Sequence, residues 1–318
     1  MDDKILVSTI TPCFRMKKYL KVFLDELPKQ TMFKNIEVVL DHNEPDEEEV
    51  LWIKEFQNKY PGRLKHIIID KVDPIGVSMN RCIKESSGEC LTIWNVDDLR
   101  TVDSIENQYR KMKENNDYGI VYGNFKVVRK FNTINGRLIR FNKYKDSEFS
   151  RSMIFGPFFM FKKDLCDKAG YFDEQLKSGA DFDFSVRLAL ISQAVMVDNC
   201  LGYYLNEGLG ASTRPGSLQA IERTVIELRY GIYDKIDFDY LKDALNYNIY
   251  SIRQFSKDYL ISNLIPDFSI FLMNREKKWL KKGLRNNFYN QIINKKKIKV
   301  IFKRMILFIF KIIKYERY

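Results

Sequence analysis

The N-terminal part of the chain alternates between apolar segments of strand length and longer charged segments, and this alternation constrains the fold more than any other feature. The apolar, β-branched segments occupy residues 4–12, 36–41, 64–70 and 90–94. The charged segments between them are typical of helices. Strands that alternate with helices form β-α-β units around a parallel sheet. The sequence therefore predicts an α/β, Rossmann-like domain with a mostly parallel sheet flanked by helices.

Polar or acidic side chains stand where three of these predicted strands end. Thr9–Thr11 lie at the end of the first strand, Asp41 closes the second, and Asp97 follows the fourth. Ligands of open α/β sheets bind beyond the carboxyl ends of the strands. We therefore expect these groups to line one edge of the sheet, as the groups of a nucleotide pocket do.

The segment Cys90–Asp98 is an apolar strand that ends in two adjacent carboxylates, Asp97 and Asp98, with Asn95 as a third source of oxygen. Hard oxygen ligands at a strand end suit Mg²⁺ or Mn²⁺ holding a phosphate-bearing substrate. Asp98 also precedes a predicted helix, so it could instead cap that helix. The residues alone leave both interpretations open.

The net charge of +11 is concentrated at the C-terminal end. Residues 276–318 hold fourteen Lys or Arg and two Glu, a net of +12, so the preceding 275 residues sum to −1. A nucleic-acid-binding body carries its own basic face, and this balance requires none. We expect no nucleic-acid partner.

The remaining predicted elements are less regular than those before Asp98. Residues 135–136 are Asn-Gly, which favours a hairpin between strands at 131–134 and 137–141. The other elements that we predict are strands over 118–129 and 194–197 and helices over 101–115, 163–169 and 181–193. Beyond residue 218 helices dominate.

Four segments from the first half of the chain contain motifs of one enzyme family. Residues 7–14 read V-S-T-I-T-P-C-F and residues 36–44 read I-E-V-V-L-D-H-N-E. They resemble the first two strands of family 2 glycosyltransferases, V-S-I-I-I-P-x-Y-N and a strand that ends D-D-G-S. Residues 76–83, with Gly76 and Asn80, resemble the family's helix G-x-S-x-A-R-N-x-G-I, and residues 87–89 resemble its A-x-G-E.

Two acidic segments complete the resemblance in the family's order. Residues 94–98 stand where the family has L-D-A-D-D, its metal-binding D-x-D. Residues 178–189 are similar to the block G-E-D-x-D-L-x-x-R-L-A. The resemblance covers roughly residues 4–205 and implies a GT-A fold over 1–215. The helical pattern and the charge beyond it predict a helical extension over 216–275 and a basic tail over 276–318.

The resemblance implies an inverting, non-processive glycosyltransferase, because the Q-x-x-R-W signature of processive members is absent. Asp181 is the implied general base, with Asp183 as its competitor. Asp97 and Asp98 are the implied ligands of Mn²⁺ or Mg²⁺. The residues that we expect to bind a nucleotide-sugar donor, UDP-linked in our reading, are Thr11, Pro12, Asp41, Gly76, Asn80, Asn95, Val96, Asp97 and Arg214. Asp41 could instead cap a turn.

Three departures from the family pattern bear on the proposed chemistry. Asn95 replaces the first acid of D-x-D, His42 replaces a second acid after Asp41, and Ala180 replaces the glutamate before Asp181. Asn95 and Ala180 keep open the alternative that the chain is a catalytically inactive partner in a membrane glycan-assembly complex. Nucleotidyltransferases and NAD-dependent enzymes are disfavoured, because no glycine-rich phosphate loop follows the first strand.

The basic tail suggests a location. Within residues 295–314, Lys and Arg fall on one side of a helix, and Ile, Phe and Met cover the other. Such a helix lies in the membrane interface and favours anionic lipids, unless it packs on the protein's own body. The five scattered cysteines indicate a reducing compartment, and we expect no signal peptide. These features predict a peripheral protein on the cytoplasmic face of a membrane, acting on a glycan or lipid-linked acceptor in surface polysaccharide biosynthesis.

Overall fold

The structure, a computed structural model, describes residues 4–141 and 155–208 in full. It also describes two short strands, β10 (Ser251–Gln254) and β11 (Lys257–Leu260), and single residues at 219, 222 and 226. Arg214, the tail at 276–318 and nearly all of the predicted extension at 216–275 lie outside the described residues. The chain divides into two compact units, Met1–Lys145 with Met153–Ser217, and Asp146–Ser152 with Leu218–Tyr318.

The first unit opens with the predicted alternation of strands and helices. Its elements up to residue 93 are β1 (Val7–Phe14), α1 (Lys17–Glu26), the 3₁₀ turns η1 (Leu27–Lys29) and η2 (Phe33–Asn35), β2 (Ile36–Asn43), α2 (Glu47–Lys59), β3 (Leu64–Ile69), α3 (Ile75–Glu85) and β4 (Cys90–Ile93). Helix α2 begins at a capping box, in which the Asp46 carboxylate accepts from the Glu49 backbone N–H and the Glu49 carboxylate accepts from that of Asp46.

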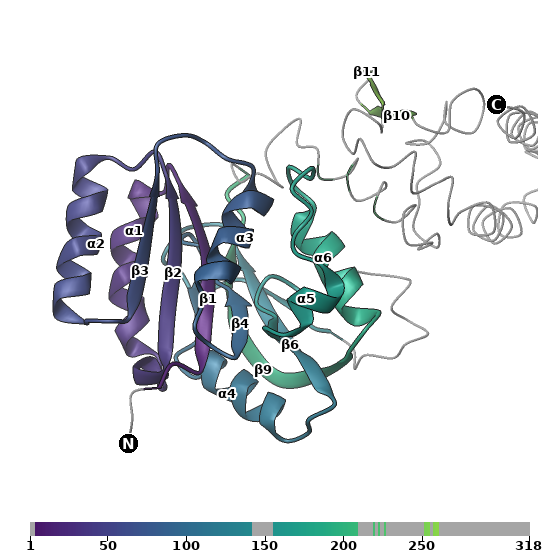
Figure 1. Cartoon of the computed structure of the whole chain (residues 1–318), viewed down its shortest axis with the longest axis horizontal. Coiled ribbons are helices and arrows are strands. Elements are labelled where there is room, and N and C mark those ends of the chain that lie inside the picture. Colours follow the sequence, from purple (N-terminus) through teal and green to yellow (C-terminus); the bar gives the residue numbers. More distant parts are fainter. Residues whose placement is uncertain are drawn as a thin grey trace, which may run out of the picture. The chain divides into compact units, whose positions relative to one another are not determined.

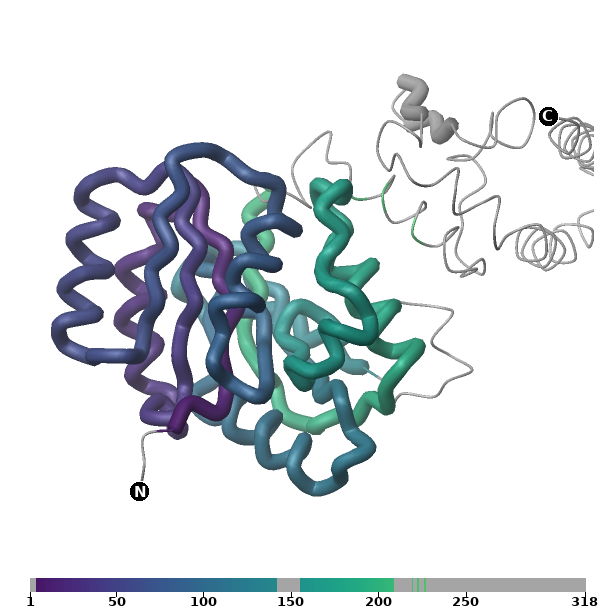
Figure 2. Tube along the Cα trace, viewed as in Figure 1, coloured from purple at the N-terminus to yellow at the C-terminus, as the bar shows by residue number. Residues whose placement is uncertain are grey.

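The later elements complete a nine-stranded sheet. They are β5 (Leu99–Arg100), α4 (Ser104–Lys113), β6 (Tyr118–Val128), β7 (Arg137–Ile139), β8 (Met160–Lys162), α5 (Leu165–Ala169), α6 (Ala180–Ala189) and β9 (Gln193–Leu205). The strand order is β3-β2-β1-β4-β8-β6-β9-β5, with β7 beside β6. Figure 2 follows the chain from the purple and blue strands of the first half to the teal and green strands of the second.

The sheet is parallel in its first four strands and mixed in the rest. β3, β2, β1 and β4 pair in parallel, whereas β8 is antiparallel to β4 and to β6. β6 and β9 pair in parallel. Parallel pairing of the first four strands places their carboxyl ends at one edge, which is the edge where we expected the ligand.

The two faces of β2 show how the layers form (Figure 1). Val38 and Leu40 belong to a core that includes Phe23 of α1 and Phe56 of α2. The alternate residues face α3, because Arg81 Nε of α3 lies 2.6 Å from the Asp41 carboxylate. Strand alternation thus sends even-numbered residues of β2 toward α1 and α2 and odd-numbered residues toward α3.

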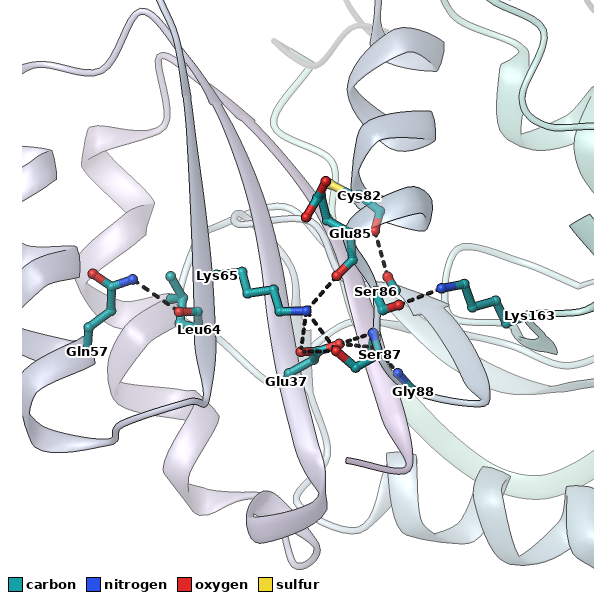
Figure 3. A network of polar contacts seen from close by, with 11 residues as sticks. Glu37, Gln57, Leu64, Lys65, Cys82, Glu85, Ser86, Ser87, Gly88 and Lys163 are labelled. Atoms are coloured by element: carbon teal, nitrogen blue, oxygen red, sulfur yellow. Dashed lines mark hydrogen bonds and ion pairs between the residues drawn. The ribbon is translucent and has the colours of Figure 1, made fainter. Parts of the chain in front are cut away.

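A buried carboxylate ties the amino ends of three strands together (Figure 3). Glu37 of β2 accepts hydrogen bonds from the Ser8 hydroxyl at 2.6 Å and from the Ser87 backbone N–H, and Lys65 of β3 lies 3.3 Å away. The Ser8 hydroxyl in turn accepts from the Gly88 N–H at 2.8 Å. Gly88 has no room for a side chain, because a Cβ there would lie 2.6 Å from the Ser8 nitrogen. The network fixes the amino edge, opposite the expected ligand edge.

Several predicted boundaries of the second half are wrong. Residues 131–134 form no strand; the hairpin pairs β6 with β7, with Val127 opposite Arg137. β9 extends from Gln193 to Leu205 rather than over 194–197. β5 occupies Leu99–Arg100, just before the point where we expected a helix. β5 and β7, with two and three residues, carry too few side chains for a periodic pattern.

Candidate functional site

The carboxyl ends of β2, β1 and β4 lie side by side, so the residues that follow them share one edge. β1 is the middle strand, with Phe14 in register with Asn43 of β2 and Ile10 in register with Ile93 of β4. The residues directly after β1 and β2, Arg15 and Glu44, have positive φ values of 55° and 50°. Non-glycine residues held in this region mark strained positions that often occur at functional sites.

Asp41 lies at this edge and its carboxylate is fully buried. Arg81 of α3 contacts it with two nitrogens, Nε at 2.6 Å from Oδ2 and Nη2 at 3.1 Å from Oδ1. The Asn43 amide donates to the same carboxylate at 2.7 Å. The hydrogen bonds from Arg81 to Asp41 raise the pKa of the arginine above its already high value. Asp41 is therefore part of a bidentate ion pair rather than the cap of a turn.

Arg81 also contacts a second acid, Asp73. Neither Arg81 nor Asp73 is among the site residues expected from the sequence. The Arg81 Nη1 lies 2.7 Å from Asp73 Oδ2, and this contact lowers the pKa of Asp73. Asp73 is anchored in turn, because its backbone N–H donates to the Asn43 side chain at 2.7 Å. The signal was present in the motif G-x-S-x-A-R-N, whose arginine falls on position 81 when Gly76 is aligned with the first glycine.

Thr11 and Pro12 lie on opposite faces of β1. The Thr11 hydroxyl is buried and lies 3.1 Å from the Thr9 hydroxyl, on the face that Cys13 shares with α1 and α2. Pro12 is in register with Asp41, so the two residues share the face toward α3. Burial raises the pKa of Cys13, and the charges of Glu49, Asp41 and Asp97 raise it further. The end of β1 thus lies within electrostatic reach of both Asp41 and Asp97.

Gly76 and Asn80 join α3 to the segment after α5. A Cβ on Gly76 would lie 2.9 Å from the Asp173 carbonyl oxygen, so only glycine allows this approach. The Asn80 side chain donates to the Phe172 carbonyl at 3.0 Å and accepts from its N–H at 2.8 Å. These contacts give both residues a positioning role; direct donor binding by either stays a prediction.

The turn after β4 turns one carboxylate inward. Asp98 is 2% exposed, its Oδ1 accepts from the Leu205 N–H of β9 at 2.8 Å, and its Oδ2 accepts from the Asn95 amide at 3.2 Å. Burial raises the pKa of Asp98 well above its ordinary value, and the charge of Asp97 adds to the shift. Asp98 therefore joins the turn to β9. Because both of its oxygens already accept hydrogen bonds, Asp98 is a less suitable metal ligand than Asp97.

Asp97 is half-buried and stands in an acidic setting. Burial raises its pKa, and the charge of Glu207 raises it further. Glu207 lies at the end of β9 and accepts from the Tyr19 hydroxyl at 2.9 Å and from Lys18 at 3.1 Å. Val96, which precedes Asp97, has a buried side chain, so only its backbone can face a ligand. An added cation at Asp97 would offset this concentration of negative charge.

The residues at Asp97 fit a cation that is shared with a ligand. Among the described residues, no group of three His, Cys, Asp or Glu side chains is arranged to hold a metal ion. Mg²⁺ is commonly held by one or two carboxylates together with substrate phosphates. Asp97 can supply one carboxylate of this kind, with Asn95 at the same turn as a neutral neighbour.

Asp181 and Asp183 both lie in the first turn of α6 but differ in setting. Asp183 is fully buried, and Arg187 donates to its Oδ2 from Nε at 2.9 Å and from Nη2 at 2.7 Å. Asp181 is half-buried, and its Oδ1 accepts from the Phe182 N–H at 2.8 Å. Asp181 therefore retains the accessibility that a proton acceptor needs, whereas Asp183 is held in an ion pair.

Comparison with known proteins identifies the family to which the chain belongs. A sequence profile described as Glycosyl transferase family 2 matches residues 8–170, just over half of the chain. The uncharacterized glycosyltransferase MJ1057 of Methanocaldococcus jannaschii is 27% identical over 195 residues. This match covers 58% of the chain and 65% of the relative, slightly less than two thirds of the relative's length.

Two solved structures share the fold. TarS (residues 1–349) of S. aureus, in complex with UDP-GlcNAc, superposes with a TM-score of 0.60 at 17% identity, covering 85% of this chain and 74% of TarS. The mannosyltransferase PcManGT of Pyrobaculum calidifontis, in complex with GDP-Man and Mn²⁺, gives a TM-score of 0.53 at 14% identity, covering 97% of this chain and 88% of PcManGT. At these identities the likeness shows the predicted GT-A fold.

Proposed function

The chain belongs to glycosyl transferase family 2, and on this premise we propose that it transfers a sugar from a nucleotide-sugar donor to a hydroxyl group with inversion. The observation that carries the proposal is the edge itself, where the Asp41–Arg81 ion pair at the end of β2 and Asp97 beyond β4 flank the end of β1. The proposed donor is UDP-linked, because TarS was solved with UDP-GlcNAc. PcManGT, solved with GDP-Man, makes a GDP-linked donor the alternative.

The proposed donor lies across three strand ends. Its base and ribose sit beside Asp41 and Pro12, where Arg81 holds the Asp41 carboxylate in a fixed orientation. Its diphosphate lies toward Asp97. We assign the metal contact to Asp97 rather than Asp98, whose two oxygens accept from Leu205 and Asn95. Asp97 would hold Mn²⁺ or Mg²⁺, which would supply positive charge to stabilise the departing nucleoside diphosphate.

Asp181 is the proposed general base. Its carboxylate takes the proton of an acceptor hydroxyl while that oxygen attacks the anomeric carbon, and the bond from this carbon to the diphosphate breaks. Attack from the side opposite the leaving group inverts the configuration. Ala180 is 2% exposed, so the position that carries glutamate in the family motif is filled here by a buried methyl group. Asp181 thus acts without a neighbouring acid at position 180.

The proposed acceptor is a glycan or a lipid-linked glycan, in the biosynthesis of a surface polysaccharide. Support comes from the basic amphipathic segment 295–314, which suits an anionic membrane surface where such acceptors lie. Among the described residues no helix has both the length and the apolar character needed to cross a bilayer. We therefore propose peripheral association through the tail, on the cytoplasmic face.

A screen of nucleotide sugars tests the proposed function. The protein is incubated with Mn²⁺ and a panel of UDP- and GDP-sugars, and released nucleoside diphosphate is measured. We expect release from at least one donor. If wild-type protein neither releases nor binds any nucleotide, the enzyme assignment fails and the inactive-partner alternative, which Asn95 and Ala180 favour, replaces it.

A further inference from the structure

Arg15 occupies a strained position at the centre of the proposed donor edge. It follows β1 directly, and its φ of 55° lies in the left-handed region that asparagine and glycine adopt more readily than arginine. The side chain is exposed, and its guanidinium lies 4.8 Å from the centre of the Phe14 ring. The cation–π contact keeps the charged group near the end of β1.

Arg15 differs from the other cations around this edge, because none of the described acids forms an ion pair with it. Lys17 contacts Asp46 and Glu48, and Lys18 contacts Glu207. Arg81 contacts Asp41 and Asp73. For Arg15, no carboxylate of the described residues lies within ion-pair distance. Its charge is therefore available to an external anion.

The strand order puts Arg15 where a diphosphate would have to pass. β1 lies between β2, which carries Asp41, and β4, which leads to Asp97. A donor with its base at Asp41 and its metal-binding phosphates toward Asp97 crosses the end of β1. Because Asp97, Glu207 and Glu44 make this edge acidic, an incoming diphosphate needs a compensating cation there.

We propose that Arg15 binds the diphosphate of the nucleotide donor through its guanidinium, an inference that rests on the proposed function. The planar guanidinium presents paired N–H donors that match phosphate oxygens. Its positive charge would add to that of a metal ion held by Asp97, where Asn95 stands in place of the first acid of the metal-binding motif. Binding of the diphosphate by the guanidinium would account for an arginine at this strained backbone position.

Calorimetric titration of UDP and uridine tests this role in wild type, Arg15→Gly, Arg15→Asn, Arg15→Lys and the control Lys21→Ala. If UDP does not bind the wild type, GDP and guanosine replace the pair. Arg15→Gly and Arg15→Asn suit the left-handed backbone, so their thermal stability should equal or exceed that of wild type. Lys21→Ala removes one positive charge from α1 without touching the strand end.

We expect Arg15→Gly and Arg15→Asn to weaken diphosphate binding by about 10- to 100-fold and nucleoside binding by less than about twofold, with Arg15→Lys in between. Lys21→Ala should match wild type. Unchanged diphosphate affinity, or equal losses for diphosphate and nucleoside, would overturn the proposal while leaving the proposed function intact. If wild type binds neither UDP nor GDP, the proposed function fails as well. Should one variant not fold, the remaining two decide.

Discussion

The carboxylates of the candidate site differ in what their oxygens already accept. Asp98 accepts from the Leu205 backbone and the Asn95 amide, and Asp183 accepts twice from Arg187. Both are buried, whereas Asp97 and Asp181 are half-buried. In each pair of neighbouring acids, one is buried and held by partners of the fold, and the other is half-buried.

Replacing Asp181 with asparagine should separate catalysis from donor binding. Asn cannot take the acceptor's proton, so we expect donor turnover to fall by about 10²-fold or more, with donor affinity and stability near wild type. Asp183→Asn is the matched control: it weakens a buried ion pair with Arg187 and should destabilise the protein by about 3 kcal/mol. Turnover assays and urea denaturation of both variants measure these effects. Wild-type turnover in Asp181→Asn would remove Asp181 from its role.

How much of the site the sequence predicts depends on where each partner lies. The Asp183–Arg187 pair has helical i, i+4 spacing and was readable from the sequence. The Arg81–Asp41 pair joins residues 40 positions apart. The family motif marks an arginine at position 81, but nothing in it indicates Asp41 as the partner. The Leu205 N–H that turns Asp98 inward lies 107 positions away, and no local pattern indicates such a contact.

At the scale of elements, Glu37 joins β1, β2, β3 and the segment before β4 (Figure 3). Burial pushes the pKa of Glu37 upward, but hydrogen bonds from Ser8 and Ser87 and the charge of Lys65 outweigh it and lower the pKa. A lowered folded-state pKa means that the charged form stabilises the fold above the unfolded pKa, and that this stability is lost as pH falls through the folded pKa.

Glu37→Gln should therefore destabilise the protein in a pH-dependent manner. We expect a loss of about 1.5–3 kcal/mol near pH 7, the range for hydrogen bonds to charged groups. The difference from wild type should shrink as pH falls from the ordinary glutamate pKa of about 4.3 through the lowered pKa of Glu37 in the folded protein. Urea denaturation at pH 7 and at acid pH measures it, with the exposed Glu48→Gln as a control near zero. A difference that is constant across pH would contradict the account.

Helices and strands were predictable where the periodic pattern of apolar side chains extends over enough residues. β1 to β4 and the helices between them follow the predicted order, because each covers enough residues to show its pattern. β8 and β5 have three and two residues and pair with distant strands, β4 and β9. Their pairing depends on tertiary packing, so the mixed half of the sheet could not be read from local sequence.

At the scale of the whole molecule, the charge of the chain is divided unevenly. The positive excess lies in residues 276–318, and the preceding residues are nearly neutral. This division fits a body that binds a small anionic donor through a few placed cations and a tail that meets an anionic surface.

Removing residues 295–318 should abolish binding to anionic vesicles. The segment holds the basic and apolar side chains of the proposed interfacial helix, so the shortened protein loses both contributions. Sedimentation with phosphatidylglycerol vesicles measures binding, with phosphatidylcholine vesicles as the control for charge. Undiminished binding to the anionic vesicles after deletion would locate the membrane contact elsewhere, and no binding by the full chain would exclude it.

The central claim is that this edge of the sheet turns over a nucleotide sugar, and release of nucleoside diphosphate by wild type and Asp97→Ala tests it most directly. With Mn²⁺ and the best donor of the panel, the account predicts release by wild type and a loss of about 10²-fold or more in Asp97→Ala, the order expected when transition-state charge loses its stabilisation. The melting temperature of the variant should not be lower, because Asp97 lies beside Asp98 and Glu207 in an acidic setting. Equal release by both proteins would contradict the account.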